Sequence, residues 1–132
     1  MNTLKEILEK SRLSFLDADD FEERTPGRFF QKKKIQISER IQQFYVVLAP
    51  GIESPVHDHK GECLTEMHLL LYGGGKFEIF DDSGNIVRTV ELEIGTFHPI
   101  FSTPTQTPKH KYVADLNLGS ITLALEFIHK PE

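Results

Sequence analysis

Residues 51–73 read GIESPVHDHKGECLTEMHLLLYG, and this stretch decides the interpretation of the rest of the chain. His57 and His59 are separated by one residue, and alternate residues of an extended strand point to the same face. We therefore expect both imidazoles to project into one space. Glu66 adds a carboxylate at the start of an apolar strand that ends at the glycine turn 73–75. Two imidazoles and a carboxylate together suit a divalent transition metal such as iron, manganese, nickel or zinc.

Three neighbouring residues are alternatives or additions to this ligand set. Glu62 competes with Glu66, but it follows His59 too closely and has no glycine at the matching distance. Cys63 is the only cysteine of the chain; it is either a thiolate ligand or, more simply, a free thiol in a loop. His68 shares the strand face of Glu66, so we expect it to point inward as an acid or base, an extra ligand, or a hydrogen-bonded interior histidine.

The spacing of these residues resembles the first motif of the cupin superfamily. The matching elements are Gly51, the His57-x-His59 pair, Glu66 and Gly73, with a longer spacer than usual between the second histidine and the glutamate. Gly95, the apolar residues 97–101 and a proline-containing loop that ends at His110 resemble the second motif. The resemblance implies a metal held by His57, His59, Glu66 and His110. His98 is an alternative fourth ligand. We prefer His110, because the phrase HKYVADLNLG, which resembles the family, begins at His110.

Within the cupins, the chain looks most similar to the WbuC-type cupin-fold metalloproteins. The resemblance covers residues 44–131 and rests on the phrases VVLAPGIESPVHDH, FDDSGNIV and HKYVADLNLGSITLALEF. It implies a fold and a metal site, and it says little about a reaction.

Alternating apolar residues predict the fold from the residues themselves. Short strands with a period of two are expected at 41–49, 76–80, 86–92 and 120–130, with a hairpin tip at 81–85. These features predict an all-β protein, a double-stranded β-helix of jelly-roll type with a short N-terminal helix. We expect a single domain in which residues 1–27 form the helix and an acidic solvated connector, and residues 28–132 form the barrel.

The basic stretch 28–38, RFFQKKKIQIS, has two interpretations. Arg28 or Lys33 could turn into the barrel and bind a carboxylate or phosphate of a substrate. Alternatively, the stretch is an exposed edge strand whose lysines discourage association between sheets, and this simpler interpretation receives more weight. His98 is a third candidate for substrate binding.

Composition excludes some partners and leads to expectations about location. The net charge of -5 argues against binding to nucleic acid or to an anionic membrane, since both need a cationic face. The charged N-terminus and the single cysteine lead us to expect a cytoplasmic protein. We also expect a small-molecule ligand at the mouth of the barrel, and a homodimer.

Two classes of function remain open. The first is a metal-dependent enzyme, an isomerase, epimerase or oxygenase, that acts on a small polar compound, which the family resemblance suggests is sugar-derived, with His68 as acid or base. The second is a non-catalytic domain that uses the metal to bind or sense a small molecule. A protein whose histidines bind no metal and which serves only as an interaction module is the least favoured.

Overall fold

The computed structural model describes residues 3–57, 64–99 and 109–128. The chain begins with helix α1 (Thr3–Ser11) and the short 3-10 helix η1 (Ala18–Asp20). Ten strands follow among these residues: β1 (Phe21–Thr25), β2 (Arg28–Gln31), β3 (Ile35–Gln36), β4 (Ile41–Leu48), β5 (Leu64–Gly73), β6 (Gly75–Phe80), β7 (Ile86–Glu91), β8 (Phe97–Pro99), β9 (Lys109–Ala114) and β10 (Ser120–Ile128). No described helix is long and apolar enough to cross a bilayer.

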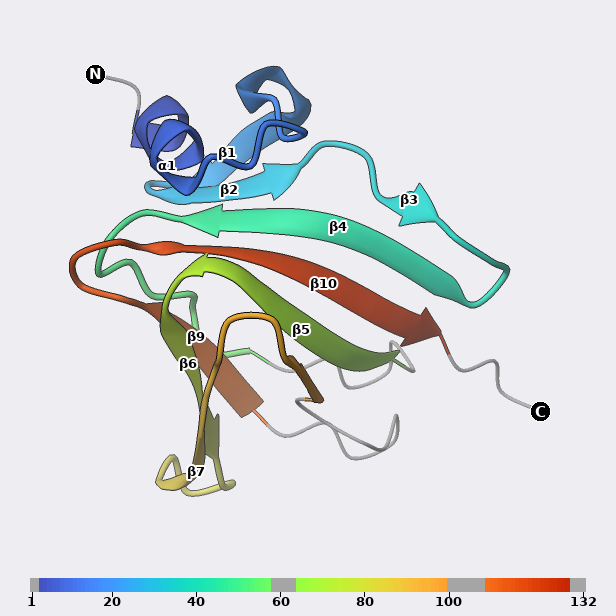
Figure 1. The fold of residues 1–132 in the computed structure, drawn as a ribbon. Coiled ribbons are helices and arrows are strands. Elements are labelled where there is room, and N and C mark those ends of the chain that lie inside the picture. The colour runs from blue at the N-terminus through green and yellow to red at the C-terminus, as the bar shows by residue number, and fades with distance from the viewer. Residues whose placement is uncertain (1–2, 58–63, 100–108, 129–132) are drawn as a thin grey trace.

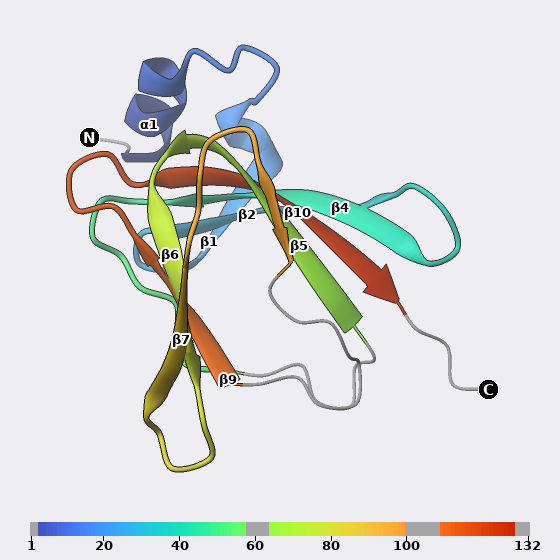
Figure 2. The ribbon, with the colours of Figure 1, turned by 60° about the horizontal axis from the view of Figure 1, so that its bottom comes forward.

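These strands form two antiparallel sheets. The large sheet has the order β1-β2-β4-β10-β5-β8, with β3 also paired to β4, and the small sheet has the order β7-β6-β9. The sheets diverge from the end where β5 passes directly into β6 (Figures 1 and 2). This architecture confirms the prediction of a mostly β jelly-roll fold with a short N-terminal helix.

The apolar residues of β4 and β10 alternate between the two faces of the large sheet. They form two hydrophobic clusters, one on each face. Phe44, Val46 and Leu48 face the small sheet and pack with Phe77 and Tyr112.

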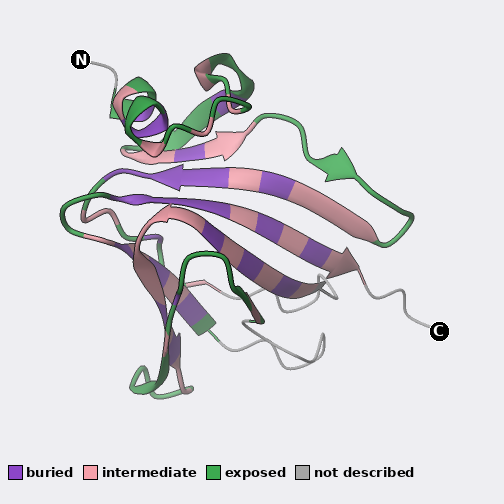
Figure 3. Cartoon of the chain, in the orientation of Figure 1, coloured by how far each residue is buried: buried purple, intermediate pink, exposed green. Residues whose placement is uncertain are grey.

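Val47 lies on the opposite face of β4 and packs against the buried side of α1, formed by Leu4, Ile7 and Leu8. Figure 3 shows the resulting alternation of buried and half-buried residues along β4, β5 and β10. The helix therefore covers the outer face of the large sheet at one end and leaves the inner face to the small sheet.

The N-terminal segment corrects two expectations. The acidic residues 17–24, expected to be only a solvated connector, contain η1 and most of β1, and Phe21 is buried in the core below α1. Strand β2 lies between β1 and β4, so it is not an edge strand. The edge interpretation suits only the exposed strand β3, because the 17–24 segment supplies an additional strand that covers β2.

Candidate functional site

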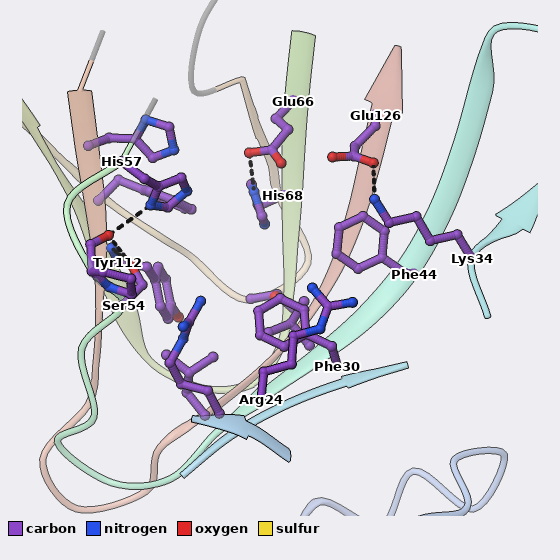
Figure 4. Close-up of a pocket in the computed structure, with 17 residues that line it drawn as sticks. Arg24, Phe30, Lys34, Phe44, Ser54, His57, Glu66, His68, Tyr112 and Glu126 are labelled. Atoms are coloured by element: carbon purple, nitrogen blue, oxygen red, sulfur yellow. Dashed lines mark hydrogen bonds and ion pairs between the residues drawn. The ribbon is translucent and has the colours of Figure 1, made fainter. Parts of the chain in front are cut away.

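A cavity of about 360 Å³ lies between the inner faces of the two sheets. This volume is typical of small-molecule sites in proteins. Its wall includes aromatic residues, two buried carboxylates, three histidines and three cations. The lining includes Arg24, Arg28, Phe30, Lys34, Phe44, His57, Glu66, His68, His110, Tyr112 and Glu126. Figure 4 shows His57 and Lys34 on opposite sides of the cavity.

His57 and His110 lie side by side at one end of the cavity. The segment before β5 runs antiparallel to β9, and the two histidines exchange backbone hydrogen bonds of 2.9 and 2.8 Å. Their ring centroids are 4.4 Å apart, and His110 is fully buried. The main chain therefore brings together two imidazoles that are far apart in the sequence.

The hydrogen bond of His57 fixes its tautomer. Its Nδ1 lies 2.7 Å from the carbonyl oxygen of Pro55, which can only accept, so Nδ1 carries the proton. In this tautomer Nε2 is the ring nitrogen that carries the lone pair. Histidines that bind metals commonly have this arrangement, because a backbone carbonyl orients the ring from its other side.

Glu66 and His68 enter the same cavity from β5. Both are buried, as expected for residues two apart on a strand, and His68 Nε2 lies 3.4 Å from Glu66 Oε2. The His68 ring also packs on Phe77 at 4.8 Å between centroids. The prediction that both side chains point inward is confirmed.

Cations and aromatic rings form the opposite side of the cavity. The Arg24 and Arg28 guanidinium carbons lie 4.3 and 5.1 Å from the centroid of Phe30, and the Lys34 ammonium lies 4.6 Å from that of Phe44. Such distances allow attraction between each cation and a ring face. The lysine also makes an ion pair of 2.8 Å with Glu126, which is buried.

Burial changes the proton affinity of two groups in the wall. It raises the pKa of Tyr112 to about 12, because the phenolate would be poorly solvated there. Burial and the neighbouring charge of Arg24 lower the pKa of Arg28 from its ordinary value. The two guanidinium groups therefore repel each other at the wall.

The structure places the other predicted residues as follows. His59, Glu62 and Cys63 lie outside the described residues. Lys33 is exposed and does not contribute to the described wall, where its neighbour Lys34 takes the place we expected for it. The side chain of His98 on β8 accepts a hydrogen bond of 3.2 Å from the Glu93 amide, and His98 is likewise absent from the described lining.

Arg24, Lys34 and Glu126 were missed as site residues. Glu126 carried a signal, since it is a lone charge in an apolar strand on the same face as Thr122 and Ala124. Arg24 and Lys34 carried none, because both lie in charged stretches without clear periodicity.

The types of donor atom around the cavity are those that bind divalent transition metals. Imidazole nitrogens and a carboxylate are ligands of iron, manganese, nickel and zinc. Within the described ranges no three His, Cys, Asp or Glu side chains form a metal-binding group by themselves. His59, the partner of His57 in the His-x-His pair, is outside those ranges.

Comparisons with known proteins show similarity in structure. No protein-family model and no curated protein sequence matches the chain. KdgF from Halomonas sp. superposes with a TM-score of 0.62 at 16% identity, over 84% of this chain and 87% of that one. A variant of Bacillus subtilis oxalate decarboxylase gives 0.64 at 20% identity, over 89% of this chain and 30% of that one. AerE from Microcystis aeruginosa gives 0.61 at 16% identity, over 83% and 46%.

These identities support a shared fold and nothing finer. The chain spans about a third of oxalate decarboxylase and about half of AerE, so their whole-protein activities are not carried over. The topology and the superpositions together show that the chain has a cupin-like fold.

Proposed function

We propose that the protein is a metal-dependent enzyme that acts on a small polar compound in the cavity. The metal would be held by His57, His59, Glu66 and His110. The observation that carries the proposal is the meeting of the His57 and His110 imidazoles at the cavity wall, with 4.4 Å between their ring centroids and the His57 Nδ1 oriented by the Pro55 carbonyl. These residues would hold a divalent metal, which would supply Lewis-acid chemistry to a substrate carbonyl or to a bound water.

The chain's own residues supply the rest of the chemistry. His68 is the proposed acid or base, because it is buried, lines the cavity and contacts Glu66 through Nε2. The aromatic wall of Phe30, Phe44 and Phe77 limits water around the substrate. Isomerisation, epimerisation and oxygenation of a sugar-derived compound are the reaction classes to test, in line with the resemblance to WbuC-type proteins.

Elemental analysis of protein purified without a metal-binding tag tests the metal centre. We expect near-stoichiometric iron, manganese, nickel or zinc in the wild type, and its loss in His57→Ala, His59→Ala, Glu66→Ala and His110→Ala. His98→Ala is the matched control, because its imidazole accepts a backbone hydrogen bond from Glu93 away from the described cavity wall. A wild type that stays empty after reconstitution would show that the metal proposal is wrong.

A second candidate is a non-catalytic domain that binds or senses a small molecule through the metal. The contact between His68 and Glu66 favours it, since a fifth protein ligand would close a position that a substrate needs. Turnover assays on carbohydrates and keto acids separate the two. His68→Gln should abolish turnover and retain metal in the enzyme, whereas ligand binding without any turnover would identify a binding domain.

The expectations about partners are proposals as well. Half-buried apolar residues of β5 and β10, among them Leu69, Leu123 and Leu125, lie on the sheet face away from the cavity and support homodimerisation. Light scattering of the purified protein measures the mass directly. The acidic net charge argues against nucleic-acid and anionic-membrane partners, and the single cysteine supports the proposal of a cytoplasmic protein.

A further inference from the structure

Two arginines share one aromatic ring in the wall opposite the histidines. The Arg24 and Arg28 guanidinium groups approach Phe30 at 4.3 and 5.1 Å, and all three residues line the cavity. A β-bulge in β1 contributes to this arrangement. Glu23 pairs with Phe29 and Thr25 pairs with Arg28, so Arg24 is the extra residue between them. Bulges commonly redirect a side chain next to a binding site.

Among the described residues, the charge of this pair is offset only weakly. Arg24 Nε lies 3.4 Å from Glu22, but both side chains of that ion pair are about half exposed, where such contacts are weak. Arg28 donates to the Thr25 hydroxyl at 3.3 Å, and its buried Nε has no hydrogen-bond partner among the described residues. A buried donor without a partner is costly, so an acceptor from a ligand would stabilise this group.

Glu126, one of the two carboxylates of the same wall, is already engaged. Glu126 accepts hydrogen bonds from Lys34 at 2.8 Å and from Gln42 at 2.7 Å. Lys34 balances its charge, which leaves the two guanidinium groups as an excess of positive charge in a partly apolar wall. An anion that enters the cavity is attracted to this point.

We propose that Arg24 and Arg28 form a carboxylate-binding site, and that the ligand of the cavity is a small organic acid. The acid group would lie against the arginines while the rest of the molecule reaches toward Glu66 and the histidines. The inference deepens the proposed function and rests on it for the role of that ligand as a substrate. The anion site itself stands on the geometry of the wall.

The construction of the wall favours a carboxylate over a phosphate. Phosphate sites are commonly built from clustered backbone N–H groups or from a helix N-terminus. Here the backbone of β2 is paired on both sides and that of β1 is paired with β2, and recognition falls to guanidinium side chains. The planar fork of arginine binds the two oxygens of a carboxylate, and of a phosphate, in the same bidentate way, so the preference for a carboxylate rests on the paired backbone.

NMR titration of the arginine Nε–H signals tests the site directly. The full chain is titrated with sodium acetate, with inorganic phosphate, and with sodium chloride at matched ionic strength. The series is recorded after chelator treatment and again with zinc. We expect acetate to shift the Arg28 and Arg24 signals saturably beyond the effect of chloride, in both samples. No shift, or an equal shift with chloride, would overturn the proposal, and tighter binding of phosphate than of acetate would overturn the assignment to carboxylates.

Variants assign the signals and measure the contribution of each arginine. Arg28→Gln and Arg24→Gln should each weaken acetate binding roughly tenfold to a hundredfold, as expected for a lost charged hydrogen bond. Arg40→Gln, an exposed arginine outside the described cavity wall, is the matched control and should leave the affinity unchanged. Arg24→Gln remains informative if the more buried Arg28 variant folds poorly, and unchanged affinity in Arg24→Gln would count against the paired site.

The metal analysis and the acetate titration can fail separately. Acetate binding to a chain that never takes up metal would leave the anion site in place and remove the proposed function. Metal binding without acetate binding would leave the proposed metal centre in place and remove the anion site.

Discussion

Glu66 on β5 and Glu126 on β10 lie directly opposite each other, and both are buried at the wall of the cavity. Residues paired in this way across antiparallel strands have side chains on the same face. The two carboxylates differ in their surroundings. Glu126 is bound by Lys34 and Gln42, whereas Glu66 contacts the imidazole of His68.

This difference predicts which carboxylate binds the metal. Glu66→Gln should lose most of the bound metal, because an amide is a much weaker ligand than a carboxylate. Glu126→Gln should retain it, since the charge of Glu126 is balanced by Lys34. Elemental analysis of the two purified variants gives the comparison, and equal loss in both would mean that the opposing pair binds the metal together.

Lys34 should contribute to stability where Lys33 does not. Lys34→Met removes a partner from buried Glu126 and should lower the free energy of unfolding by about 1–2 kcal/mol. Lys33→Met is the matched control, since Lys33 is exposed and such surface changes are usually within about 0.5 kcal/mol. Urea denaturation of both variants measures the difference, and an equal effect would contradict the role of the Lys34–Glu126 ion pair.

Tyr112 should make the protein less stable at alkaline pH. Its pKa is about 12 in the folded protein against 10.0 for an ordinary tyrosine, so the unfolded chain loses the phenolic proton first as pH rises. The contribution is constant below about pH 10, and stability then falls by about 1.4 kcal/mol per pH unit up to about pH 12. The Tyr112→Phe variant should not show this part of the decrease in unfolding free energy at alkaline pH. Urea denaturation across this range, with Tyr72→Phe as control, checks the prediction, which fails if both variants follow the wild type.

Gly73 should be intolerant of any side chain. It has a φ of +79° at the end of β5, and an added Cβ would overlap the carbonyl oxygen of Gly119. Gly84 has a similar φ of +87° but open space around it. Gly84→Ala should therefore cost only the backbone strain, about 1–2 kcal/mol, and Gly73→Ala about 1–3 kcal/mol more from the clash. Thermal or urea denaturation separates the two effects, and equal losses would mean that strain alone decides.

Where the period of two is regular, as in β4, β5 and β10, sequence patterns predicted the strands and the inward side chains, because these depend on local periodicity. A period of two fixes the face of each residue, so Glu66 and His68 were placed together correctly. The contact of His57 with His110 depends on which segments pair, and only the resemblance to a family pointed to it. Lys34 could not be told from Lys33 because the face of a residue outside regular strands does not follow from periodicity. Arg24 was hidden by a bulge, which breaks the same periodicity.

The hairpin of β1 and β2 lies at one edge of the large sheet and joins it through the pairing of residues 28–30 with β4. His57, Glu66 and His110 come from other segments, so the two ends of the cavity are encoded by separate pieces of chain. Phe21 and Phe29 hold the hairpin in the core below α1. Arg24, Phe30 and Arg28 could therefore be substituted together while Phe21 and Phe29 are kept. Such substitutions would change the ligand specificity of the cavity without altering the proposed metal ligands.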